Sequence, residues 1–156
     1  MQRHWRIHIV MGLCAVLAAS SVWAGGSPFV GRWHLNKAQS TLPPGEAAPN
    51  DFVHEISRAD DSRVQWAITV VAADGRSYVE TFDATASGAA HPLGNGTTVS
   101  FSLSGDTLRA TFRGPAGQSD VQTCTLSPDQ KQMTCRGILT GAKGPTVNYV
   151  DVYDRM

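Results

Sequence analysis

The side chains that could do chemistry are scattered along this chain rather than gathered in one motif. Beyond an N-terminal segment considered below, three histidines remain: His34, His54 and His91. No two of them have the i, i+2 spacing that would place two metal ligands on one side of a strand. No serine lies in a Gly-x-Ser-x-Gly motif, the nucleophile turn of many hydrolases. We therefore expect no catalytic residue, no metal and no cofactor, while a three-histidine site assembled by folding stays open.

Four carboxylates fall within stretches that have the pattern of strands: Glu55, Glu80, Asp83 and Asp151. For each one alone, a place facing solvent is the simpler expectation, but any of them could point into a barrel and bind or titrate there. Glu80 stands out because it shares a predicted strand face with Tyr78 and Phe82. A carboxylate desolvated among aromatic rings would be paired or have a raised pKa.

The first 24 residues have the features of a secretory signal. Arg3 and Arg6 precede an apolar run over residues 7–19, and Ala24 is a small residue suited to cleavage. The run is shorter than the ~20 residues that span a membrane, so no stable transmembrane segment is expected after cleavage. A retained membrane anchor is the alternative. We expect an exported protein, periplasmic or secreted, with residues 25–156 forming one domain.

Charge and composition exclude several classes of function. The full chain has 156 residues, with 13 basic and 13 acidic side chains. Loss of Arg3 and Arg6 with the signal leaves a net charge of −2, and the remaining basic residues do not cluster. Nucleic-acid binding is therefore not expected. The glycine-rich segments 94–96 and 114–117 precede no predicted helix, so they are turns rather than phosphate loops.

Two cysteines survive signal removal, Cys124 and Cys135. An even pair in an exported protein is typical of a disulfide, with free thiols or a metal pair as the alternative. A hairpin turning over residues 128–131 places Cys124 opposite Cys135 and Leu126 opposite Met133. This register predicts a cross-strand disulfide.

The elements that must position these residues are strands. Apolar residues recur with period two between clusters of Gly, Pro, Asn, Asp and Ser, and no helical run is found after residue 29. Nine strands are predicted, over residues 30–35, 51–58, 64–72, 76–84, 97–104, 107–113, 119–127, 131–139 and 146–153. The Pro-rich segment 38–50 is expected to be a loop across one end of the fold, and 88–96 an irregular connection. An all-β antiparallel up-and-down meander closed into a barrel is favoured over a sandwich, because closure removes unpaired edges.

Two hairpins have predictable registers. A two-residue turn at Gly105-Asp106 pairs Leu103 with Leu108, Phe101 with Ala110 and Val99 with Phe112, which puts all six side chains on one face. A two-residue turn at Asp74-Gly75 pairs Val70 with Val79, Ile68 with Thr81 and Trp66 with Asp83. Both faces of this second hairpin are partly apolar, so which face is interior stays open.

The start of the predicted domain carries a family resemblance. Residues 31–37 are Gly-Arg-Trp-His-Leu-Asn-Lys, followed by Ser40 and the Pro-rich loop. This resembles the Gly-x-Trp start of lipocalin-like (calycin-type) barrels. It is also similar to small exported bacterial proteins that begin Gly-x-Trp-x-Leu-Asn and end in a strand with a Val-Tyr pair, here Val152-Tyr153. The resemblance implies a barrel with Trp33 packed across one end, and it implies no particular activity.

Three classes of function remain for such a barrel. The lumen could hold a small hydrophobic or amphipathic ligand, be filled by its own side chains in a cell-envelope interaction module, or serve an enzyme of unknown chemistry. The predicted inward-facing set is apolar: Val99, Phe101, Leu103, Leu108, Ala110, Phe112, Leu126, Met133 and Leu139. We favour ligand binding, with a lining of Trp66, Val99, Phe101, Leu103, Leu108, Phe112 and Met133. A cavity above about 300 Å³ would support a container.

Overall fold

The computed structural model describes residues 26–156, so the predicted signal segment lies outside the described part. Within that part the chain forms strands, turns and loops and no helix. The strands are β1 (Gly31–Leu35), β2 (Asp51–Ala59), β3 (Arg63–Val71), β4 (Ser77–Thr85), β5 (His91–Gly94), β6 (Thr97–Ser104), β7 (Thr107–Arg113), β8 (Ser119–Leu126), β9 (Gln132–Thr140) and β10 (Thr146–Arg155). The predicted all-β antiparallel barrel is confirmed.

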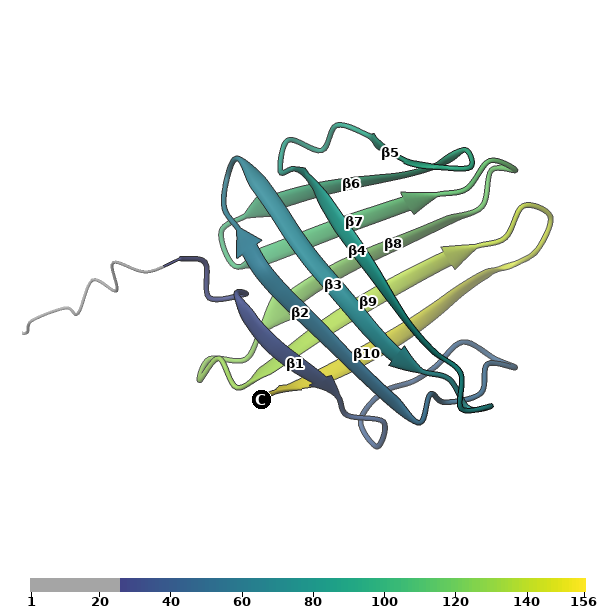
Figure 1. Ribbon diagram of the computed structural model, residues 1–156, viewed down its shortest axis with the longest axis horizontal. Coiled ribbons are helices and arrows are strands. Elements are labelled where there is room, and N and C mark those ends of the chain that lie inside the picture. The colour runs from purple at the N-terminus through teal and green to yellow at the C-terminus, as the bar shows by residue number, and fades with distance from the viewer. Residues whose placement is uncertain (1–25) are drawn as a thin grey trace, which may run out of the picture.

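Pairing follows the chain, with one closure and one gap. The strand order is β4-β3-β2-β1-β10-β9-β8-β7-β6-β5, so the first strand pairs with the last. In Figure 1, β2, β3 and β4 cross in front of the strands β6 to β10 at a steep angle. Strands β4 and β5 form the two edges of the sheet, and an isolated bridge between Ser87 and Ser102 links the chain across the gap. The barrel is therefore nearly closed, and its seam lies in the middle of the sequence.

Strand β5 corrects the expectation that residues 88–96 are irregular. It pairs with β6 through His91 with Val99 and Pro92 with Thr98. Asn95 and Gly96 both have positive φ angles, 43° and 79°. That combination is typical of a tight type I′ hairpin turn, for which Asn-Gly is a strong sequence signal. The signal was present at Asn95-Gly96, but Pro92 and the nearby glycines obscured it.

Two predicted registers hold in the structure. Leu103 pairs with Leu108, Phe101 with Ala110 and Val99 with Phe112. On the next hairpin, Cys124 lies opposite Cys135 and forms a disulfide with it, at a Cα–Cα distance of 3.9 Å. In both hairpins the apolar residues nearest the turn alternate with polar ones, so a shift by one residue would expose buried side chains.

The predicted register of the β3–β4 hairpin is wrong by one residue. Trp66 pairs with Phe82, Ile68 with Glu80 and Val70 with Tyr78, rather than with Asp83, Thr81 and Val79. The turn has three residues, 73–75: the amide of Ala72 donates to the carbonyl of Arg76, and Gly75 has φ 84°. A three-residue loop ending in a left-handed glycine is a common hairpin turn that Asp-Gly also serves. The shift places Trp66 and Phe82 together on the interior face.

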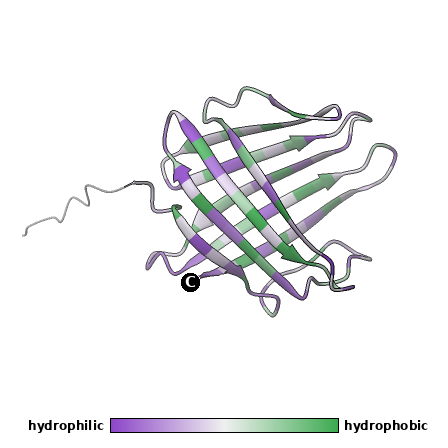
Figure 2. Cartoon of the chain, viewed as in Figure 1, coloured by the Kyte–Doolittle hydropathy of each residue, from purple (hydrophilic) through white to green (hydrophobic). Residues whose placement is uncertain are grey.

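One end of the barrel is filled with side chains. Strand residues alternate in hydropathy along the sheet (Figure 2), and the inward-facing ones meet in a common core. Phe29, Trp33, Phe101, Leu108 and Met133 have no exposed surface. The indole N–H of Trp33 donates to the carbonyl of Phe29 (2.9 Å), and the Arg155 guanidinium lies 4.0 Å from the Trp33 ring centroid. Trp33 thus packs across this end, as the Gly-x-Trp start implied.

Candidate functional site

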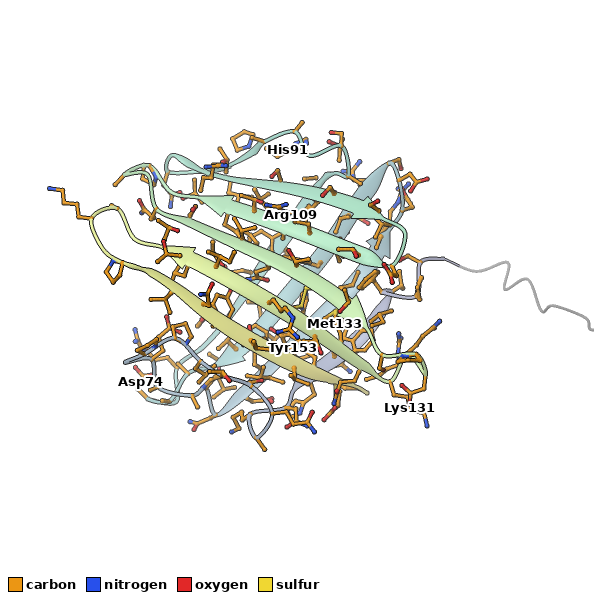
Figure 3. All side chains as sticks on the ribbon, turned by 180° about the vertical axis from the view of Figure 1, so that it is seen from behind. Asp74, His91, Arg109, Lys131, Met133 and Tyr153 are labelled. Atoms are coloured by element: carbon orange, nitrogen blue, oxygen red, sulfur yellow. A yellow bond between two sulfur atoms is a disulfide. The ribbon has the colours of Figure 1, made fainter. Side chains whose placement is uncertain are left out.

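The other end of the barrel is hollow. One cavity of about 580 Å³, here called the loop pocket, lies between the Pro-rich loop, the β3–β4 turn and strands β2, β3, β8, β9 and β10. Figure 3 places Asp74 of that turn and Lys131 at opposite ends of the barrel, with Tyr153 and Met133 between them. The loop pocket is lined by Leu35, Leu42, Pro43, Glu46, Ala47, Pro49, Phe52, Val70, Ala72, Ala73, Asp74, Tyr78, Asp120, Leu139, Tyr149, Asp151 and Tyr153.

A second cavity of about 330 Å³, the gap pocket, adjoins the first and reaches the seam between β4 and β5. It is lined by Phe52, His54, Trp66, Ile68, Glu80, Phe82, Leu93, Thr97, Phe112, Asp120, Gln122, Asp151 and Tyr153. Phe52, Asp120, Asp151 and Tyr153 line both pockets. The two pockets therefore share a wall, and we refer to them together as the lumen cavity.

Aromatic rings form much of the wall of the lumen cavity. The Trp66 ring centroid lies 6.0 Å from those of Phe82 and Phe112, and the Phe82 and Phe112 centroids are 5.2 Å apart. Phe52 and Tyr153 are tilted against one another at 5.8 Å. These separations are those of favourable aromatic pairs. The rings pack against one another and contribute apolar surface to the cavity lining.

A glycine allows a tyrosine to lie across the sheet toward Asp120. Tyr149 pairs with Gly137 on β9, and a Cβ atom at Gly137 would overlap the Tyr149 ring. The ring therefore covers the glycine, and its hydroxyl lies 2.8 Å from both carboxylate oxygens of Asp120. Gln122 Nε2 also donates to Asp120, at 2.9 Å. Burial, with the charge of Asp120 second, raises the pKa of the Tyr149 hydroxyl, so this group stays a donor.

Asp151 lies on the same inward face of β10, between Tyr149 and Tyr153. Its burial raises its pKa to about 6, and the charges of Asp120 and Glu46 add to the shift. The hydrogen bond from the Tyr153 hydroxyl, 3.4 Å from Oδ2 of Asp151, lowers the pKa and offsets part of this shift. Asp151 is thus a half-buried carboxylate that titrates near neutral pH beside other negative charges.

Two ring nitrogens in the wall lack a hydrogen-bond partner. His54 and Trp66 both line the gap pocket, and neither His54 Nε2 nor Trp66 Nε1 is bonded within the described residues. The two rings meet edge to face at 4.5 Å. Burial lowers the pKa of His54 to about 3, so its side chain is neutral at physiological pH.

The residues predicted to line the lumen divide between the gap pocket and the packed core. Trp66 and Phe112 line the gap pocket. Val99, Phe101, Leu108 and Met133 are fully buried and line neither the loop pocket nor the gap pocket, and Leu103 packs against the core as a partly buried residue. Sequence reasoning did not select Phe52, Asp120, Tyr149 or Tyr153. The alternation of Tyr149, Asp151 and Tyr153 on one strand face was the available signal for a polar, aromatic wall.

Other kinds of site have less support among residues 26–156. The open possibility of a three-histidine metal site finds no support, since no group of three or more His, Cys, Asp or Glu side chains in this part of the chain could hold a metal ion. In the same residues, no helix is long and apolar enough to cross a membrane.

Comparison with solved structures identifies the fold. The wild-type fluorescent protein UnaG superposes with a TM-score of 0.54 at 17% identity, covering 82% of this chain and 97% of that one. Secretory abundant heat soluble protein 4 from Ramazzottius varieornatus gives 0.53 at 11% identity (84% and 96% covered). A fatty acid-binding protein from brain tissue of Drosophila melanogaster gives 0.51 at 15% identity (81% and 98%). The fold is calycin-like.

Sequence comparison adds no family to this assignment. No protein-family model matches the chain, and no curated protein matches it. At identities of 11–17% the structural likeness describes the calycin-like fold alone, so function must be argued from the lumen cavity.

Proposed function

We propose that this protein is an exported carrier that binds a small hydrophobic or amphipathic ligand in its lumen. The observation that supports the proposal is the loop pocket of about 580 Å³ at one end of the barrel, which shares four lining residues with the gap pocket. Small-molecule sites are concave, mostly apolar and about 300–1,000 Å³ in volume, with a few placed polar groups. The lumen cavity has this size and this mixture, with aromatic walls and the polar group around Asp120 and Asp151.

Two further observations are consistent with the proposal. Of the similar structures, one is named a fatty acid-binding protein and another a secretory protein, names that describe those proteins' own ligand and location. The Cys124–Cys135 disulfide is compatible with an oxidising compartment, and the Gly-x-Trp-x-Leu-Asn start resembles exported bacterial proteins.

The test is a titration of the purified protein with Nile red, an uncharged fluorescent probe. We expect one saturable site, and we expect Ile68→Trp to weaken it because Ile68 lines the gap pocket. Thr69→Trp is the matched control, since Thr69 is the next residue on β3 and is exposed. Absence of saturable binding, or equal binding by both variants and the wild type, would contradict a lumen site.

A further inference from the structure

Every charged side chain that lines the lumen cavity is acidic. The cavity also has one histidine, His54, which is neutral. The acidic residues are Glu46, Asp74, Glu80, Asp120 and Asp151. No lysine or arginine lines either pocket in the described part of the chain, although the full sequence has equal numbers of acidic and basic residues. His54 is buried and, with its pKa lowered to about 3, adds no positive charge at neutral pH. The cavity is therefore negative while the molecule as a whole is nearly neutral.

Most of this negative charge has no ion-pair partner among the residues that the structure describes. Asp74 pairs with Arg76 (2.7 Å), but Glu46, Glu80, Asp120 and Asp151 take part in none of the ion pairs among residues 26–156. The side-chain donors to Asp120 are neutral, the hydroxyl of Tyr149 and the amide of Gln122. Partly burying Asp120 and Asp151 without a cation costs free energy. A ligand that supplies positive charge would therefore gain favourable electrostatic energy by neutralising these carboxylates.

Aromatic side chains line the cavity together with these carboxylates. Phe52 and Tyr153 line both pockets together with Asp120 and Asp151, and their ring centroids are 5.8 Å apart. Trp66 and Phe112 continue the aromatic wall within the gap pocket. The faces of aromatic rings attract ammonium groups, and quaternary ammonium ligands are commonly bound by such rings. Carboxylates and aromatic faces together thus favour the same class of ligand.

We propose that the lumen cavity selects an organic cation, a protonated or quaternary amine with an apolar body. This inference rests on the proposed function and specifies its ligand class. The ammonium group lies near Asp151 and Asp120, and the apolar body packs against the aromatic and aliphatic walls of the two pockets. An anionic amphiphile such as a fatty carboxylate would meet like charge and no arginine or lysine in the lining. A bare metal ion would leave the apolar walls unused.

The experiment compares three probes with ten-carbon chains: decyltrimethylammonium, decanol and decanoate. Each is titrated by calorimetry at pH 7.5 and low salt, below the micelle concentration of the two ionic probes and below the solubility limit of decanol. We expect the cation to bind at least about tenfold more tightly than decanoate, with decanol between them, and added salt to reduce the difference. Equal affinities for all three would leave the carrier function standing and overturn the cation preference. Tighter binding of decanoate would also overturn it, and failure of all three together with Nile red would overturn the carrier function itself.

Charge-removing variants test whether the lumen carboxylates cause the preference. Asp151→Asn and Asp120→Asn should each weaken decyltrimethylammonium binding by about five- to tenfold and leave decanol within twofold. Asp106→Asn is the matched control, because Asp106 is exposed in the β6–β7 turn and lines neither pocket. Thermal unfolding of each variant identifies any that fails to fold. If folded Asp151→Asn and Asp120→Asn both bind the cation as the wild type does, the proposal is wrong.

Discussion

At the scale of single residues, His54 makes stability depend on pH. Its folded pKa of about 3 lies below the ordinary value of 6.5, because burial opposes its charged form. Between these values the unfolded chain binds a proton that the folded chain does not, so stability falls as pH drops below 6.5. Replacing His54 with Phe should remove up to about 1.4 kcal/mol per pH unit of this slope. Urea unfolding at pH 7, 5.5 and 4.5 measures this slope, with His34→Gln at an exposed histidine as the control. If the stability of the wild type and of His54→Phe changes in parallel with pH, the prediction is wrong.

Asp151 should act in the opposite direction. Its pKa is raised by burial from 3.8 to about 6, so between these values the folded chain binds the extra proton and stability falls as pH rises. Asp151→Asn cannot ionise, and we expect its free energy of unfolding, relative to wild type, to rise by about 2–3 kcal/mol between pH 4 and pH 7. Asp106→Asn serves as control. A constant difference across this range would show that the Asp151 carboxylate is not desolvated.

The Tyr149–Gly137 pair gives a second kind of residue-scale test. A methyl group at Gly137 would overlap the Tyr149 ring, so Gly137→Ala should destabilise the protein by about 1–3 kcal/mol and break the hydrogen bond to Asp120. In a Tyr149→Ala background the overlap is absent. The same glycine substitution should then cost little, which a double-mutant cycle by urea unfolding measures. Additive effects would contradict the packing seen here.

At the scale of elements, neighbouring strands β6 and β7 contribute phenylalanines that both lie beside Trp66 but have different exposure. Phe101 is fully buried in the core, whereas Phe112 is partly buried and lines the gap pocket. Phe101→Ala should lower the free energy of unfolding by about 3–5 kcal/mol and leave Nile red affinity unchanged in the folded fraction. Phe112→Ala should lower that affinity with a smaller loss of stability. The reverse ranking in paired unfolding and fluorescence titrations would contradict the assignment of the site to the lumen cavity.

At the scale of the whole molecule, export and oxidation can be tested together. We expect the secreted or periplasmic protein to lack residues 1–24 and to contain no free thiol, since Cys124 and Cys135 are joined. Mass spectrometry with and without reductant measures both. Because the disulfide closes a short loop, with a sequence separation of 11, the Cys124→Ser, Cys135→Ser variant should lose about 2–3 kcal/mol of stability. Two free thiols in the native exported protein would contradict this prediction.

The sequence by itself determined the features that depend on residues close together in the chain. Strict alternation about Gly105-Asp106 and around the Cys124–Cys135 pair specified two registers, because a one-residue shift would turn the buried side chains of those strands to solvent. The same alternation specified an all-β meander. The β3–β4 register could not be predicted, because Asp74-Gly75 occurs in turns of two or three residues and both strand faces are partly apolar.

The site itself was decided by tertiary structure. Alternation predicts which side chains point inward. Which of them pack against one another and which line a cavity depends on how β2–β4 cross the opposite strands. Met133 and Phe101 became packed core, while Phe52, Asp120 and Tyr153, far apart in sequence, came to share one wall. The negative charge of that wall is equally a product of folding: among residues 26–156, no arginine or lysine lines the lumen cavity, whereas several carboxylates do.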